Sequence, residues 1–283
     1  MFRFLTDDFK TQLTHSVVIA LSAALLCFET LVLSGVERQQ VFVMYFDLPA
    51  ALFFITFFVY NFHHIGELQQ KILGGYFEKT FLPFIIIITS VFSYRIFNQS
   101  YESGNSAVLI LTGALAALFT YSYVFNRKLA EQIRQNFILK NSLLMLTYSI
   151  ATVTVPLIYA GQNVFDAGNI YIFLRRMIFI GALVIPFEIR DMQKDAGHRH
   201  SNIANEFGIG FSKITAIFLL VLFSVLTLLQ FGSKAFSGVL LLSAALSALL
   251  ILLYQNRHRT GSVILLLTDT MMLMQAFLVL IVA

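Results

Sequence analysis

Long apolar runs separated by short polar segments dominate the chain. A run of about 20 mostly apolar residues can cross the hydrocarbon core of a bilayer as an α-helix. The pattern therefore predicts an all-α polytopic membrane protein with about nine transmembrane helices. Because one run is short and another carries charge at both ends, eight or ten helices stay open. The runs lie at about 14–34, 41–62, 81–97, 107–126, 137–161, 170–190, 209–231, 235–255 and 261–282.

Composition excludes an ordinary soluble globular protein. The chain is 58% hydrophobic and 12% charged, with a mean hydropathy of +0.80, far from the values of soluble domains. The longest predicted loops, at 63–80 and 191–208, are too short for a separate soluble domain, so residues 1–283 are predicted to form one transmembrane domain. The single cysteine, Cys27, excludes a disulfide framework or a thiolate metal cluster.

The distribution of basic residues predicts orientation. If the connecting segments alternate between the two sides, the N-terminal side collects 14 of the 19 Lys and Arg residues. This bias predicts that the N-terminus and both long loops are cytoplasmic. The net charge of +4 is then explained by topology and by attraction to membrane lipids, and we infer no nucleic-acid partner. The opposite side receives five basic residues: Arg38, Arg95, Arg175, Arg176 and Lys234.

An acidic cluster follows the sixth run, in the segment P-F-E-I-R-D-M-Q-K-D-A-G from Pro186 to Gly197. On a helix, Glu188, Asp191 and Asp195 fall within about 60° of one another. Three like charges at a membrane boundary repel, which favours a bound cation such as Mg²⁺, an ion that prefers oxygen ligands. A solvated helix end is the simpler alternative.

Basic residues accompany this acidic face. Arg190 and Lys194 flank it at roughly 110°, where they could contact an anion held by the metal. A second basic segment, 121–140, contains Arg127, Lys128 and Lys140 beside Tyr123, and indicates a phosphate clamp. For both groups the alternative is the ordinary positive charge of cytoplasmic loops.

A second ligand set is predicted directly after the second run. Asn61, His64 and Glu67 lie there, and His63 precedes His64. Together with His198 and His200 of the later loop, these histidines could instead form a transition-metal site, or they could simply bind lipid headgroups.

Nine predicted spans, the two long loops and the acidic cluster together resemble the UbiA superfamily of intramembrane prenyltransferases. Asp191, Asp195 and Gly197 match the family's second aspartate-rich motif, with Glu188 one turn earlier. The basic segment 123–140 is similar to the family's diphosphate-binding segment. The first motif, NDxxDxxxD, is reduced to its asparagine, Asn61, because Phe62, Ile65 and Gln69 occupy the aspartate positions.

The resemblance implies nine helices around a central cavity and a Mg²⁺-dependent transfer of a prenyl group. The donor would be a polyprenyl diphosphate, and the acceptor an aromatic or other lipophilic molecule. Asp191 and Asp195 would be catalytic. The implied metal ligands are Glu188, Asp191, Asp195, Asn61 and Glu67, and the implied substrate-binding residues are Arg127, Lys128, Arg190, Lys194, Lys140, Tyr123 and His64.

Other functions stay open. The altered first motif also fits a UbiA-like protein that binds an isoprenoid or diphosphate lipid without transfer, as a carrier or partner subunit. A secondary transporter could use Glu29 and Asp47, two acids within predicted spans that should face the interior, paired or protonated. A histidine-metal membrane enzyme would use the histidine pairs.

Overall fold

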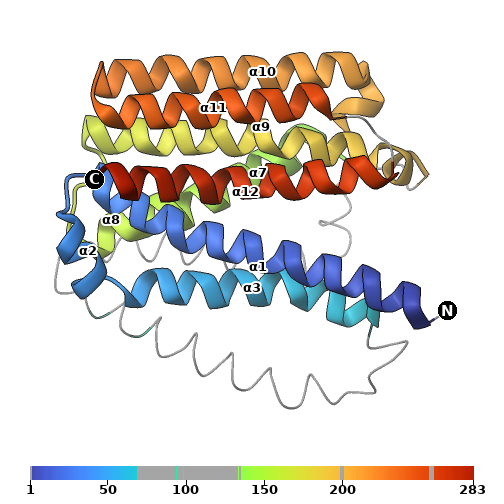
Figure 1. The fold of residues 1–283 in the computed structure, drawn as a ribbon, viewed down its shortest axis with the longest axis horizontal. Coiled ribbons are helices and arrows are strands. Elements are labelled where there is room, and N and C mark those ends of the chain that lie inside the picture. The colour runs from blue at the N-terminus through green and yellow to red at the C-terminus, as the bar shows by residue number, and fades with distance from the viewer. Residues whose placement is uncertain are drawn as a thin grey trace.

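The computed structural model describes residues 2–68, 94, 98, 133, 135–197, 201–254 and 258–283. Within these residues the regular elements are all helices (Figure 1). They are α1 (Phe2–Leu33), α2 (Arg38–Met44), α3 (Asp47–Leu68), α7 (Phe137–Ser149), the π-helix η2 (Ile150–Thr154), α8 (Val155–Tyr159), α9 (Ala167–Gly197), α10 (Ile203–Phe231), α11 (Ala235–Leu253) and α12 (His258–Val282).

Six stretches of the described chain are long and apolar enough to cross a membrane. They confirm six of the predicted spans and indicate an integral membrane protein. The predicted runs at 81–97 and 107–126 lie outside the described residues, Tyr94 apart, so the count of nine and the central cavity stay predictions. The six spans are Thr14–Leu33, Phe137–Tyr159, Ala167–Met192, Ile203–Phe231, Ala235–Leu253 and Ile264–Val282.

Three boundaries differ from the prediction. The second run, 41–62, is broken at Tyr45 and Phe46 into α2 and α3; its apolar character continues through the break, so hydropathy alone does not reveal it. Residues 63–68 and 191–197, predicted as parts of loops, are helical, because α3 continues to Leu68 and α9 to Gly197. The arginine, methionine, glutamine and lysine in the last turns of α9 are good helix formers, so that helix can extend past its apolar run.

Helix α10 begins at Ile203, six residues before the start of the predicted span 209–231, and it is kinked between these two points. Gly208 has φ 84° and ψ 163°, a kink inside α10 between a short first segment and the long straight one. This left-handed φ favours glycine. The helix therefore turns at Gly208 and lies partly outside the apolar run that hydropathy detects.

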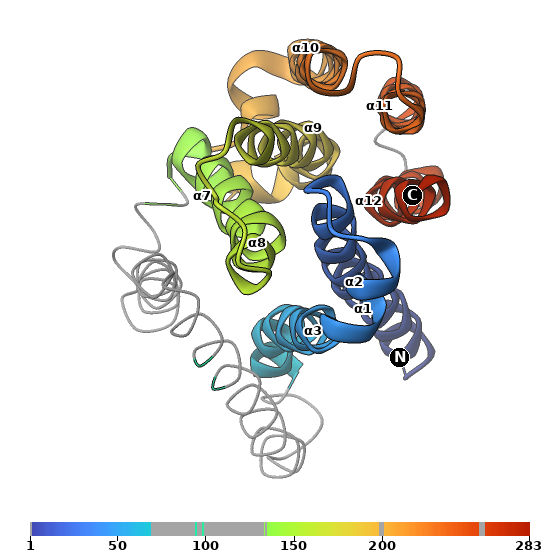
Figure 2. The same ribbon diagram turned by 90° about the vertical axis from the view of Figure 1, so that its left-hand side faces the viewer.

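Helix α1 occupies a central place in the bundle. It packs against α3, α12 and η2, while α10 packs between α9 and α11 (Figure 2). Of the six spans α1 is the most buried and α10 the least. Large apolar side chains of α10 such as Ile214, Phe218 and Leu229 are exposed, as expected of a helix that faces lipid.

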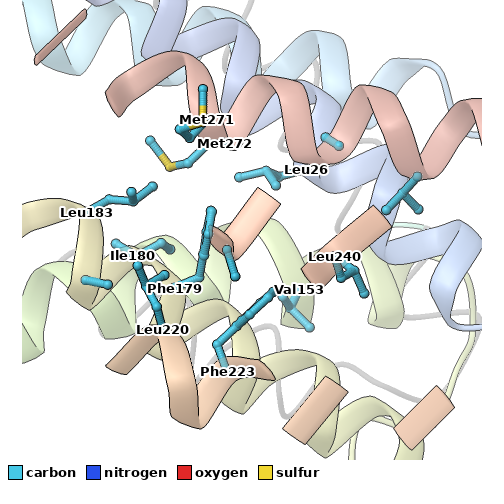
Figure 3. Packing of buried hydrophobic residues seen from close by; sticks show 14 of the residues in the cluster. Leu26, Val153, Phe179, Ile180, Leu183, Leu220, Phe223, Leu240, Met271 and Met272 are labelled. Carbon is cyan, nitrogen blue, oxygen red and sulfur yellow. The ribbon is translucent and has the colours of Figure 1, made fainter. Parts of the chain in front are cut away.

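The buried core lies among α1, α9, α10 and α12 (Figure 3). Phe179 of α9 packs against Phe223 of α10, with 5.1 Å between ring centroids. Gly181 lets α7 and α9 approach closely, since a Cβ atom there would lie 2.5 Å from the Met145 sulfur. Small residues commonly allow such close approach in membrane bundles.

The π-helix η2 joins α7 to α8 and is tied to α1. Pro156 has no N–H to give to the Thr152 carbonyl four residues earlier. The Thr30 hydroxyl of α1 donates to that carbonyl at 2.7 Å. A side chain of a neighbouring helix thus satisfies the carbonyl that proline leaves free, as membrane interiors require.

Candidate functional site

The acidic cluster lies on the last turns of α9. The helix is continuous from Ala167 to Gly197, so Glu188, Asp191 and Asp195 occupy positions on one helical face, as predicted. Glu188 is buried, whereas the side chain of Asp191 is 38% exposed. The side chains of Asp195 and Lys194 lie outside the described part of the structure.

Each of the two described acids has a cationic partner. Lys140 Nζ of α7 lies 2.6 Å from Glu188 Oε1. Arg190 donates to Asp191 through Nε and Nη2, each at 2.7 Å, the two-bond geometry typical of strong Arg–carboxylate pairs. Protein side chains therefore supply the charge compensation that the sequence attributed to a metal ion. They also include two residues, Lys140 and Arg190, predicted to bind a diphosphate.

Two asparagines of α10 hold the end of α9 in place. Asn202 caps α10 by accepting from the Ala204 N–H at 2.9 Å, and its Nδ2 donates to the Glu188 carbonyl at 2.8 Å. Asn205 Nδ2 donates to the Met192 carbonyl, also at 2.8 Å. These bonds fix the backbone on either side of Asp191 and so position the acidic cluster.

Helix α7 places Lys140 at the end of the bundle where α9 carries the acidic cluster. Asn136 caps α7 by accepting from the Leu139 N–H at 3.1 Å, an arrangement that satisfies one of the free N–H groups of a helix start. Phe137 contacts Phe207 of α10 edge to face, with 6.0 Å between centroids. Lys140, one turn later, thereby reaches Glu188.

A second, partly buried pair lies near Arg190, toward the same end of the bundle. His15 Nδ1 of α1 is 2.7 Å from Asp269 Oδ2 of α12, and the Asp269 side chain is only 4% exposed. The charges of Asp269 and Arg190 interact electrostatically. The sequence analysis missed this pair; an acid inside the apolar run 261–282 is the signal that could have found it.

Tyr254, which follows α11, is the third group near Arg190. Burial raises the pKa of its phenol, an effect that the positive charge of Arg190 opposes. The phenol is therefore neutral at physiological pH. Its backbone carbonyl accepts from Lys213 Nζ at 2.6 Å, which ties the end of α11 to α10.

The other predicted ligands are placed only in part. Asn61, His63, His64 and Glu67 belong to the last turns of α3, and α3 and α9 end at the same end of the bundle (Figure 1). Their side chains lie outside the described part. The predicted residues Tyr123, Arg127, Lys128, His198 and His200 lie outside the described residues altogether.

The oxygen ligands present suit Mg²⁺ in type. This ion commonly binds one or two carboxylates together with substrate phosphates and water, and Glu188 and Asp191 supply two carboxylates. Among the residues with described side chains, no group of three His, Cys, Asp or Glu could hold a metal. A Mg²⁺ site at this position would therefore depend on Asp195, on the end of α3 or on the substrate itself.

A charged cluster also lies inside the membrane-spanning part. The sequence analysis assigned Arg175 and Arg176 to the side opposite the long loops, yet both are buried within α9. Arg176 Nη2 lies 3.3 Å from Glu29 Oε2 of α1, which confirms that Glu29 is paired. Asp47 is instead in the first turn of α3, because the break at Phe46 places it at a helix start.

Comparisons of the chain with models of known families, with curated proteins and with solved structures find no match.

Proposed function

We propose that this protein is a membrane-embedded prenyltransferase of the UbiA type. It would transfer a prenyl group from a polyprenyl diphosphate to an aromatic or other lipophilic acceptor, with Mg²⁺. The observation that supports the proposal most is the end of α9, where Glu188 and Asp191 lie one turn apart and are held by Lys140 and Arg190 at 2.6 and 2.7 Å.

These ion pairs suit a ligand that carries both signs of charge. A diphosphate bound with Mg²⁺ offers oxygens to Lys140 and Arg190 and a cation to Glu188 and Asp191. Each side chain can then exchange its partner without being left unpaired, which would be costly for the buried Glu188. The end of the bundle is thus prepared to accept a magnesium diphosphate in place of its internal pairs.

In the proposed reaction the bond between the prenyl carbon and the diphosphate oxygen breaks, and the diphosphate leaves with the electron pair. Lys140 and Arg190 would stabilise the negative charge on the leaving group. Bound Mg²⁺ would add to the same stabilisation. The acceptor forms the new bond to the prenyl carbon and loses a proton, and apolar surroundings would keep water from the reactive carbon.

A second candidate function is binding of a diphosphate lipid without transfer. It is supported by the ion pairs themselves, which already compensate both described acids, and by Asn61 as the one residue kept from the first motif. Such a protein would serve as a carrier or as a partner subunit.

One experiment separates the two functions. Purified protein is incubated with labelled polyprenyl diphosphates and a panel of aromatic acceptors, with Mg²⁺ or with EDTA, and both binding and diphosphate release are measured. Release and a prenylated product that require Mg²⁺ support the transferase. Saturable binding without release supports the binding protein, and the absence of both contradicts the two proposals.

A further inference from the structure

Two adjacent arginines lie deep in the bundle, away from the acidic cluster. Arg175 and Arg176 are each 3% exposed. Arg175 lies eight residues after the start of α9, or about 12 Å along the helix axis, and some 20 Å from Glu188. Charged side chains at such positions are costly and usually mark a functional site.

Arg176 has its partners on α1. Its Nη2 lies 3.3 Å from Glu29 Oε2 and 3.4 Å from both the Thr30 hydroxyl and the Leu26 carbonyl. Gln275 Nε2 of α12 donates to the other Glu29 oxygen at 3.0 Å. The single carboxylate of this cluster is therefore occupied by Arg176 and Gln275.

Arg175 points to α10 instead and has weaker partners. Its Nη1 donates to the Thr227 hydroxyl at 3.5 Å, and its guanidinium carbon lies 4.8 Å from the centroid of the Phe231 ring. Its Nε is buried without a hydrogen-bond partner, as is Arg176 Nη1. Both atoms are donors that a bound anion could satisfy.

The charges of this cluster do not balance. Among the described residues, Glu29 is the one acid that interacts electrostatically with Arg175, and the positive charge of Arg176 repels that of Arg175. Two guanidinium groups thus share one carboxylate, which leaves one positive charge uncompensated in a buried place. Removing the counter-charge of a buried ion is strongly destabilising, so an anion at this position would stabilise the folded protein.

We propose that Arg175, beside the positive charge of Arg176, forms an intramembrane binding site for an oxyanion, a phosphate or carboxylate group. The planar guanidinium of Arg175 offers paired donors to such a group, and Phe231 holds its plane. Thr227 is one turn before the end of α10 at Phe231, which places the site near the membrane surface opposite the acidic cluster. The group could belong to a lipid headgroup or to a free anion. The proposal does not depend on the proposed prenyl transfer.

The test measures the melting temperature (Tm) of the full-length protein in neutral phosphatidylcholine nanodiscs. Inorganic phosphate at constant ionic strength is one probe, and nanodiscs with added phosphatidylglycerol are the other. We expect either probe to raise Tm by about 3 °C or more when the ligand is at ten times its Kd. A response to phosphatidylglycerol alone identifies a lipid headgroup, and a response to phosphate alone identifies a free anion.

Substitutions distinguish the site from general charge. Arg175→Met should abolish the rise in Tm, whereas Lys234→Met should keep it, because Lys234 is an exposed cation at the same end of the bundle. Without added anion, Arg175→Met should match or exceed the wild-type Tm, since it removes the uncompensated charge. Arg175→Lys keeps the charge but not the paired donors, so it should weaken the rise in Tm several-fold. It provides a second variant if Arg175→Met does not fold.

Two results would overturn the proposal. One is a wild-type protein whose Tm responds to neither probe. The other is a Tm that falls in Arg175→Met without added anion while its response to both probes stays at the wild-type level. That pattern would assign Arg175 a purely structural role through Thr227 and Phe231.

Discussion

The buried Glu29–Arg176 pair gives a sharp prediction about stability. Replacing Glu29 by Gln removes the one carboxylate of the described residues that faces the two buried guanidinium groups of Arg175 and Arg176. The side chains of Glu29 and Arg176 are 1% and 2% exposed, so water cannot replace the lost partner. Breaking a buried pair from one side typically costs about 3–5 kcal/mol, and we expect a loss of that size for Glu29→Gln.

The pair can be tested as a double-mutant cycle. Glu29→Met combined with Arg176→Met removes both charges, so its loss of stability should be smaller than the sum of the two single losses by about 2 kcal/mol or more. The assay is the free energy of unfolding in mixed micelles, measured by titration with a denaturing detergent. A Glu29→Gln protein within about 1 kcal/mol of wild type, or additive losses in the cycle, would refute the reasoning.

Three further changes test other contacts. Gly181→Ala should be less favourable than Gly238→Ala by about 1 kcal/mol, because alanine is the better helix former at both positions, but at 181 its Cβ must displace the Met145 sulfur, whereas open space surrounds Gly238. Thr30→Val should cost about 1–3 kcal/mol in unfolding free energy by leaving the buried Thr152 carbonyl unpaired and by removing an acceptor of Arg176, and Thr215→Val, on a partly exposed face of α10, should cost less than half of that. Lys140→Met should weaken Mg²⁺-dependent binding of a polyprenyl diphosphate by about tenfold, with Lys234→Met as the control, because a lost charge-assisted hydrogen bond is worth about 1.5–3 kcal/mol. If a substitution and its control change the measured free energy or affinity equally, the contact proposed for the substituted residue is contradicted.

The spans were predictable because the bilayer fixes the length of an apolar helix. The helix ends were not. Both α3 and α9 extend past their apolar runs, to Leu68 and Gly197. The arginine, glutamine and lysine near the end of α9 favour helix, whereas the histidines and the glycine near the end of α3 do not. The kink at Gly208 is likewise a matter of backbone conformation, to which hydropathy is blind.

The sequence predicts which acids lie together at the candidate site, but it does not predict which side chains pair with them. The spacing of Glu188 and Asp191 on one helix follows from sequence, but their pairing does not, because Lys140 belongs to another helix. His15 and Asp269 are 254 residues apart, and Glu29 and Gln275 are 246 apart. Contacts over such separations depend on how the helices pack, which the sequence pattern alone does not specify.

The central claim is that the acidic end of α9 handles a magnesium diphosphate, and Asp191→Asn tests it most directly. The measurement is Mg²⁺-dependent diphosphate release from a labelled polyprenyl diphosphate, at matched amounts of folded protein. Glu37→Gln is the control, since Glu37 is an exposed acid in the turn between α1 and α2. We predict that Asp191→Asn abolishes release while Glu37→Gln retains it; release at the wild-type rate by Asp191→Asn would contradict the account.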